Sequence, residues 1–198
     1  MSFQTIFEAQ QSMTVNNRRV IGQQTSRAGF MTVAQYLTAV PWVFTVTPHN
    51  FLYYPTARQI IQTIDNNDRQ IPEDIVFTSA NLEWFTAMRG TATSASLNGT
   101  PTANTQTLNV TSNGNFKAGD FVEVGGYVYK VTSDSAGSSI GIHRPLIGIP
   151  SSGSPVLLGN NVTFNLVASV CPTYTLNPMT DGAFVQWDEP FVFQEYIV

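Results

Sequence analysis

Apolar and polar residues alternate in the N-terminal part of the chain in a way that predicts β-strands. Trp42, Phe44 and Val46 occupy every second position, which is the period of a half-buried strand. They close a longer stretch, residues 13–47, that we expect to be mostly extended. A further short strand is predicted at residues 75–77, shortly after a proline.

The period of a helix is found in one segment, residues 56–67. Its apolar residues fall on a single stripe at helical spacing: Ala57, Ile60, Ile61 and Ile64. Thr56 follows a proline and is suited to the N-cap position, and the Asp-Asn-Asn run at residues 65–67 suits an ending. We therefore expect one helix, which packs on a sheet and has a structural role.

The character of the sequence changes at Gly90. Residues 90–106 are small and polar with few apolar anchors, and they are predicted to be a linker or an exposed loop. Residues 121–131 predict a hairpin, because two strand-like runs flank Gly125 and Gly126, and glycine tolerates the positive φ of a two-residue turn. Further short strands are predicted at residues 107–110, 140–142 and 156–158. About five short strands within roughly 60 residues favour a small barrel of the oligonucleotide/oligosaccharide-binding (OB) type.

Strand character continues to the end of the chain, at residues 161–169, 184–187 and 190–198. These assignments predict a mainly β protein: a β-sandwich or barrel domain with one α-helix, and a small OB-like β-barrel inserted into it. Residues 1–88 and 165–198 would form the host domain, and residues 89–164 the inserted barrel. Insertion is tolerated where both ends of the guest lie close together at a surface loop of the host.

The surface predicted from composition is unusually poor in charge. Asp, Glu, Lys and Arg make up 11% of the 198 residues, against roughly 25% in a typical soluble domain. Polar uncharged residues must therefore cover much of the surface, which favours a surface that is covered by neighbouring subunits. Compositional drift, as in exported and viral β-proteins, is the alternative explanation.

Charge and hydropathy also exclude some classes of protein. The net charge of −4 and the pI near 5.0 argue against a nucleic-acid-binding protein, which needs a basic surface. No apolar run approaches the ~20 residues of a membrane span, and the N-terminal residues lack the features of a signal peptide. We therefore expect no membrane insertion.

The sequence offers little for catalysis or for metal binding. His49, His143 and Cys171 are too few and too far apart for a zinc site, which needs three or four clustered ligands. No nucleophile elbow and no phosphate-binding loop is present. Adjacent carboxylates such as Asp188 and Glu189 could serve a glycosidase, but such pairs are more often surface or turn residues. We expect no catalytic residue, no metal site and no cofactor, and we predict that the chain is not an enzyme.

Three passages of the chain carry a resemblance to a known family. The first is the strand, proline and helix of residues 42–68, with a strand region up to Trp84. The second is the segment FKAGDF at residues 116–121, which leads into the strand at residues 127–131. The third is the return to the host sheet, which ends at residues 191–198. In this order the parts resemble the distal tail (Dit) proteins and related baseplate or tail-tip ring proteins of long-tailed bacteriophages.

The resemblance implies a structural subunit of a virion, in the phage tail tip or baseplate. Such proteins form a ring, commonly hexameric, between the tail tube and the tail hub, and they dock other baseplate proteins. Larger relatives carry a galectin-like carbohydrate-binding or fibre-docking module, for which this chain has no room. Three alternatives remain open: a carbohydrate-binding or adhesion module of a virion, a tail-associated hydrolase, and a single-strand nucleic-acid-binding barrel that stacks bases on Phe121, Tyr127 and Tyr129.

Charged residues suggest which faces would meet in a ring, because a ring subunit contacts its neighbours through two different surfaces. The candidate basic face holds three arginines: Arg18, Arg19 and Arg27. The candidate acidic face holds four carboxylates from the C-terminal segment, which has no Lys or Arg after residue 164: Asp181, Asp188, Glu189 and Glu195. The alternative is that these charges pair within one chain or face water.

The charge hypothesis is tested by reversing two arginines together, Arg18→Glu with Arg19→Glu. We expect assembly to weaken, and the defect to depend on salt, because opposite charges across an interface are screened by ions. Sedimentation velocity at low and high salt measures the assembly state. A distribution of species equal to that of the wild-type protein at both salt concentrations would contradict the hypothesis.

Overall fold

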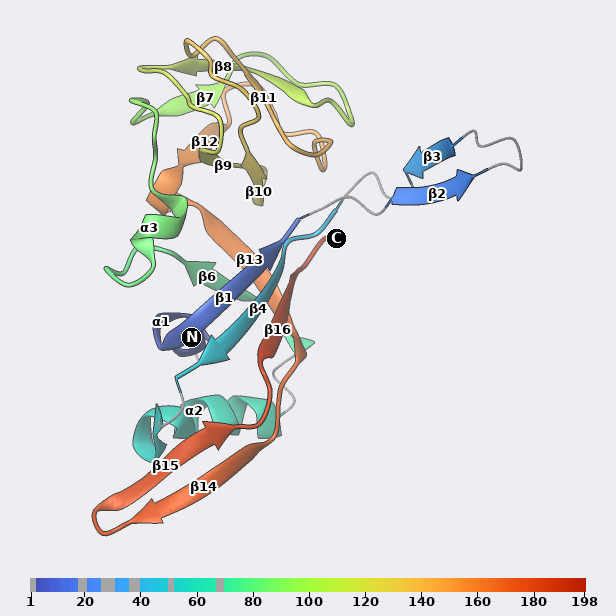
Figure 1. Cartoon of the computed structure of the whole chain (residues 1–198). Coiled ribbons are helices and arrows are strands. Elements are labelled where there is room, and N and C mark those ends of the chain that lie inside the picture. Colours follow the sequence, from blue (N-terminus) through green and yellow to red (C-terminus); the bar gives the residue numbers. More distant parts are fainter. Residues whose placement is uncertain (1–2, 18–20, 26–30, 36–39, 50–51, 67–69) are drawn as a thin grey trace. The chain divides into compact units, whose positions relative to one another are not determined.

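The computed structural model describes residues 3–17, 21–25, 31–35, 40–49, 52–66 and 70–198 (Figure 1). Strands dominate this part of the chain and their curled sheets form half-barrels, so the prediction of a mainly β protein is confirmed. The chain divides into two compact units. The first comprises residues 1–16, 41–85 and 163–198, and the second comprises residues 17–40 and 86–162. The predicted host domain and inserted barrel remain a prediction.

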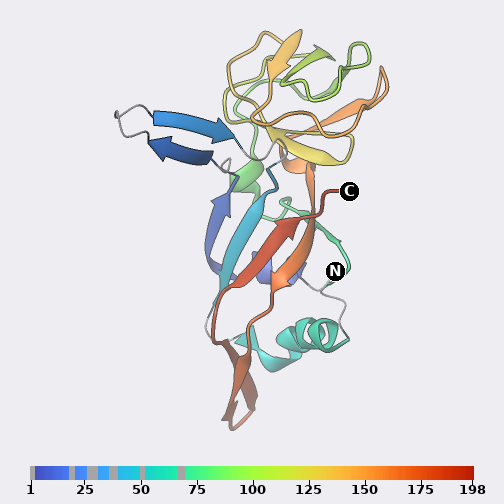
Figure 2. The ribbon, with the colours of Figure 1, turned by 90° about the vertical axis from the view of Figure 1, so that its right-hand side faces the viewer.

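The first unit contains a five-stranded antiparallel sheet with the order β1-β4-β16-β13-β6. Figure 2 shows β16, in red, between β4 and β13. The strands have the following bounds: β1 Gln10–Asn16, β4 Val43–Pro48, β6 Glu73–Val76, β13 Thr163–Val170 and β16 Phe191–Glu195. The strands predicted around Trp42 and at the C-terminus are therefore confirmed, and the C-terminal strand lies in the middle of the sheet.

An aromatic core covers one face of this sheet. Phe44 of β4 lies 5.1 Å from Phe164 of β13, and Phe77, just after β6, lies 5.4 Å from Phe164, in each case between ring centroids and edge to face. Such pairs add about 0.5–1.5 kcal/mol each beyond the area they bury. Helix α1 (Gln4–Glu8) adds Phe7, which lies 5.8 Å from Phe44. The alternation seen in the sequence thus points one face of β4 into a core built from four separate segments.

A second sheet of the first unit has three strands in the order β14-β15-β5. Their bounds are Tyr174–Met179 for β14, Gly182–Trp187 for β15 and Leu52–Tyr53 for β5. Helix α2 (Tyr54–Asp65) packs against β15 and β5, which confirms that the predicted helix lies on a sheet. Its apolar stripe is buried at Ala57, Ile60 and Ile61.

The predicted start of this helix is wrong. Tyr53 holds the N-cap position, and Pro55 lies within the first turn rather than before it. Proline fits there because its fixed φ suits a helix and the first turn has no need of its missing N–H. Two short helices were also not predicted, α1 and α3 (Glu83–Thr86), because one turn is too short to show a periodic pattern.

The second unit contains a six-stranded sheet with the order β10-β9-β12-β7-β8-β11. Its strands are β7 Ala95–Leu97, β8 Thr107–Ser112, β9 Phe121–Val124, β10 Tyr127–Lys130, β11 Ser139–Gly141 and β12 Pro155–Leu158, and the 3-10 helix η2 (Gly159–Asn161) follows β12. The predicted hairpin is confirmed, with φ of 63° at Gly125 and 82° at Gly126 between β9 and β10. The sheet curls until its outer strands approach each other, because Val131, directly after β10, forms a bridge with Ile142.

The prediction of a linker at residues 90–106 is wrong. This segment contains β7, which pairs with β8 and β12, and it buries Ala92 and Leu97. It packs closely because Gly90 lies against backbone: a Cβ atom at Gly90 would come within 2.2 Å of the Asn115 carbonyl oxygen. The small residues that indicated a flexible loop are therefore needed for close approach of two chain segments.

Asp120 links the segment before β7 to the loop before β9 in the second unit. Its side chain is 1% exposed, and its two carboxylate oxygens accept hydrogen bonds from the backbone N–H groups of Arg89 (2.7 Å), Gly90 (3.1 Å) and Lys117 (2.7 Å). The carboxylate thus fixes residues 89 and 90, which precede β7, to the loop before β9. Nearby in the same unit, Arg144 is fully buried and donates to the carbonyl oxygens of Val40 (2.6 Å) and Val128 (2.9 Å).

Strands β2 (Ile21–Thr25) and β3 (Met31–Gln35) form an antiparallel hairpin. Among the described residues this two-stranded sheet pairs with no other strand. A hairpin of two strands is only marginally stable alone in water, so these ten residues are a place where neighbouring chain or a partner would add stability.

Replacing Asp120 with asparagine tests its structural role. The change keeps the size of the side chain but leaves one acceptor oxygen for three backbone donors, so we expect the free energy of unfolding to fall by about 2–4 kcal/mol. Urea denaturation followed by circular dichroism measures it. The matched control is Asp181→Asn, in an exposed turn, for which we expect a change within about 0.5 kcal/mol. Equal effects of the two variants would contradict the assignment.

Candidate functional site

The predicted interface charges fall into three groups. Arg18, Arg19 and Arg27 lie outside the described residues. Asp181 and Glu189 are exposed, Asp181 in the turn between β14 and β15 and Glu189 just after β15. They remain candidates for a contact with a neighbour.

Asp188 and Glu195 are already engaged within the chain. The Asp188 carboxylate, although exposed, accepts hydrogen bonds from the hydroxyl groups of Thr173 (2.6 Å) and Thr175 (3.4 Å). Glu195 is 6% exposed, and its Oε2 accepts from the Trp42 N–H at 3.1 Å, while the Glu195 N–H donates to the Trp42 carbonyl at 2.8 Å. Its carboxylate is thus buried against the start of β4, because the C-terminal strand enters the sheet there.

Strand β14 is an exposed edge with apolar side chains. It pairs with β15 on one side, and within the described part of the chain no strand pairs with its other side. Tyr174 is 38% exposed, Leu176 46% and Met179 62%. Asp181 is the one charged residue between positions 172 and 187. This edge therefore offers unpaired backbone groups beside apolar side chains, with little charge to repel another strand.

The edge strand β6, unlike β14, is covered by another part of the chain. The side-chain amide of Gln4 exchanges two hydrogen bonds with the backbone of Val76: its Nε2 donates at 2.9 Å and its Oε1 accepts at 3.0 Å. Glu73 in turn accepts from the backbone N–H groups of Phe3 and Gln4. Helix α1 thus occupies the edge of β6, and β14 lacks such a cover among the described residues.

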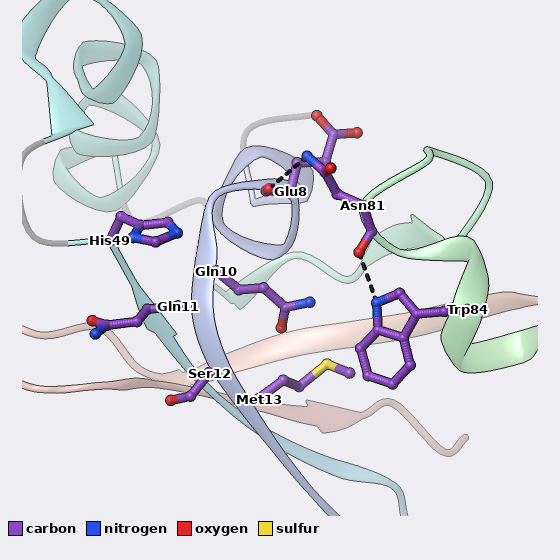
Figure 3. A pocket seen from close by; sticks show the side chains of 8 residues that line it. All are labelled: Glu8, Gln10, Gln11, Ser12, Met13, His49, Asn81 and Trp84. Atoms are coloured by element: carbon purple, nitrogen blue, oxygen red, sulfur yellow. Dashed lines mark hydrogen bonds between the residues drawn. The ribbon is translucent and has the colours of Figure 1, made fainter.

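A cavity of about 480 Å³ in the first unit is lined by residues of α1, β1 and α3, by Asn81 before α3 and by His49 after β4 (Figure 3). Its lining residues are Glu8, Gln10, Gln11, Ser12, Met13, His49, Asn81 and Trp84. The volume is within the range of about 300–1,000 Å³ typical of small-molecule sites. We refer to it as the Trp84 pocket.

Trp84 is held outward by local structure. Its indole Nε1 donates to the Asn81 carbonyl oxygen at 2.8 Å, and the ring packs edge to face on Phe85 at 5.9 Å. Phe85 itself contacts the aromatic core, 5.0 Å from Phe77. The short helix α3 therefore turns one aromatic residue inward and leaves its neighbour 63% exposed. Figure 3 shows the indole ring at one side of the pocket.

A β-bulge shapes the other wall of the pocket. The pairing of β1 with β4 shifts register between Gln10 and Ser12, so Gln11 is an extra residue in the strand. Bulges re-aim side chains and are common next to functional sites. In Figure 3 the side chains of Gln10 and Met13 extend from β1 on the side of Trp84, and Gln11 and Ser12 extend on the other side, where His49 lies.

The chemistry of the pocket is polar and almost uncharged. Glu8 and His49 are its titratable lining residues, and no lysine or arginine is among the lining residues that the structure describes. Gln10 Oε1 is shielded from solvent and accepts no hydrogen bond within that same part of the chain. A buried acceptor of this kind is stabilised when a donor reaches it.

Neither metal binding nor base stacking gains support from the geometry. In the described ranges no group of three or more His, Cys, Asp or Glu side chains could hold a metal ion. His143 accepts a hydrogen bond from the Lys130 N–H through Nδ1 at 3.0 Å. Of the three residues considered above for base stacking, Phe121 and Tyr129 are buried in the second unit at 4% and 0% exposure, and Tyr127 is half-buried. Among the described helices, none is long and apolar enough to cross a membrane.

Sequence reasoning missed the Trp84 pocket and the β14 edge. Trp84 carried no signal, because an aromatic residue in a short irregular segment is more often part of a core. β14 was not predicted because Asn177 and Pro178 interrupt its pattern, and proline is accepted there only because the strand lies at an edge.

Comparisons with known proteins add no relative: no protein-family model matches the chain, and no curated protein matches it.

Asp134 and Lys117 form an exposed ion pair in the second unit, with 2.7 Å between Nζ and Oδ2. The hydrogen bond from Lys117, followed by that from the Ala118 N–H, lowers the pKa of the Asp134 carboxyl below its usual range. A carboxyl whose pKa is lower in the folded state contributes stability at neutral pH, and this contribution is lost as the pH falls through the folded-state pKa.

Lys117→Met should therefore raise the pKa of Asp134 toward its usual range. A carbon-detected NMR titration of the carboxyl groups measures this pKa in both proteins. Lys130→Met is the matched control, since the Lys130 ammonium lies over the Phe121 ring rather than beside Asp134. An Asp134 pKa that is the same in all three proteins would contradict the proposed cause.

Proposed function

We propose that this protein is a structural subunit of a bacteriophage tail tip or baseplate, which joins copies of itself in a ring. The observation that carries the proposal is the outer edge of β14, where apolar side chains lie beside backbone groups with which no other described strand pairs. The low content of charged residues over the whole chain supports it. The resemblance to Dit-like ring proteins supplies the biological setting.

Natural proteins usually protect the exposed edges of their sheets. An exposed edge invites pairing with another strand, and natural proteins usually block it with charge, proline or a covering element. In the described ranges, Gln4 covers β6, whereas the protection of β14 is a single proline, Pro178. The occupant that we propose for the β14 edge is a second copy of the chain.

Charge supports a head-to-tail arrangement of the copies. The charged residues of the β14–β15 hairpin and its flanks are all acidic: Asp181, Asp188 and Glu189. The predicted complement is the arginine cluster Arg18, Arg19 and Arg27. Two different complementary surfaces on one subunit generate a closed ring when the rotation between neighbours divides a full turn, and we propose six subunits, as in the family that the chain resembles.

The finer description of the fold belongs to the same proposal. We infer that the curled six-stranded sheet is the small OB-like barrel, and that the first unit is the β-sandwich or barrel domain that forms the ring. The remaining partners would be the tail-tube protein on one side and the tail hub with other baseplate proteins on the other. The site of action is then the virion, after synthesis in the host cytoplasm.

The test is the solution mass of the purified protein, by multi-angle light scattering over a range of concentrations. We expect a discrete species several times the mass of the 21.7 kDa chain. The double variant Leu176→Lys with Met179→Lys should reduce it to the monomer, because two ammonium groups on β14 repel a neighbouring strand and are costly to bury.

The matched control places two lysines at exposed apolar positions elsewhere, Ile71→Lys with Ile149→Lys (61% and 60% exposed, against 46% and 62% for Leu176 and Met179). This variant should keep the mass of the wild-type protein. Dissociation of both double variants would show that the effect is not specific to β14 and would contradict its role as the contact between copies. A wild-type monomer at every concentration would contradict self-assembly by this chain.

A further inference from the structure

We propose that the Trp84 pocket binds a neutral saccharide. This inference does not depend on the assembly proposed above, since it rests on residues of β1, α1 and the α3 segment rather than on β14. It assigns a recognition function to a cavity of a chain that is otherwise proposed to be structural.

The aromatic wall of the pocket suits one face of a sugar ring. A pyranose presents a flat face of C–H groups, which packs against the π-face of an indole and is attracted by its negative charge density. Trp84 is 63% exposed, yet its orientation is fixed by the Nε1 hydrogen bond to Asn81 and by the contact with Phe85. A ring that is both exposed and pre-oriented loses little conformational freedom on binding.

The polar wall suits the hydroxyl groups of the same ligand. Side-chain amides both donate and accept, so Gln10 and Asn81, which lie on the side of β1 that faces Trp84, can each bond a hydroxyl in either role. Gln10 Oε1 lacks a donor among the described residues, and Figure 3 shows the Gln10 side chain on the same side of β1 as the indole ring. Since this oxygen is shielded from solvent, a ligand hydroxyl beside Trp84 would satisfy it once the Gln10 side chain turns toward the pocket.

Other classes of small ligand fit less well. A phosphorylated or sulfated ligand needs cationic donors, and the described lining residues include a carboxylate, Glu8, but neither lysine nor arginine. A wholly apolar ligand would cover several polar side chains without bonding them, which costs free energy. A ligand with one apolar face and many neutral hydroxyl groups meets both walls.

The binding test begins with a glycan array probed with the full-length wild-type protein. Positive glycans are then titrated in solution, beside a fixed panel of neutral hexasaccharides of glucose, N-acetylglucosamine, mannose and galactose. Intrinsic fluorescence gives the signal, because Trp84 is exposed whereas the other two tryptophans, Trp42 and Trp187, are 1% and 7% exposed. We expect saturable binding accompanied by a shift of the emission to shorter wavelength.

The affinities of variants then show whether the saccharide binds at Trp84. Trp84→Ala should weaken binding about tenfold or more, measured by calorimetry, because the stacking surface is lost. Trp84→Phe should retain part of the affinity. The matched control is Tyr196→Ala, which removes an aromatic side chain of similar exposure (47%) that does not line the pocket, and it should bind as the wild type does.

Two results would overturn the proposal. One is the absence of saturable binding to any glycan of the array or the panel by the folded wild-type protein. The other is binding by Trp84→Ala with unchanged affinity, when circular dichroism shows that the variant is folded. Light scattering on Trp84→Ala separates this outcome from the assembly proposal, because the variant should still reach the wild-type mass.

Discussion

The first unit depends on the packing of aromatic side chains that come from distant parts of the chain. Phe7, Phe44, Phe77, Phe164 and Phe193 lie within contact of one another, and each belongs to a different element or to the segment beside one. The five-stranded sheet brings these segments together, and the sheet is complete only when β16 lies between β4 and β13. Burial of this cluster is a non-local contribution, so no short segment of the first unit is stable by itself.

The two units are stabilised in different ways. The core of the first is built of large rings, whereas the second has many short strands around a mostly aliphatic core and adds close backbone approach at glycines and one buried carboxylate, that of Asp120. This difference explains why small polar residues and glycines are frequent in the sequence of the second unit, whereas large aromatic residues are frequent in the first.

Prediction from sequence succeeded where local pattern and tertiary burial agree. The alternation at Trp42, Phe44 and Val46, the Gly125-Gly126 turn and the stripe of α2 each report one local property that the fold keeps. It failed where the local signal has two causes. The small residues at 90–106 suit both a flexible loop and tight packing, and an exposed tryptophan is indistinguishable in sequence from a buried one. The edge strand β14 and the Trp84 pocket could not be found, since both are defined by what remains uncovered after folding.

The place of the last strand has a consequence for the order of events during synthesis. β16 (Phe191–Glu195) follows every other strand of the first unit along the chain, so it leaves the ribosome after them. The strands of the six-stranded sheet lie between residues 95 and 158 and emerge earlier, so this sheet is free to form during translation. The five-stranded sheet is completed only after β16 has emerged. The sheet of the second unit can therefore form first, although the first unit contains the earlier strand β1.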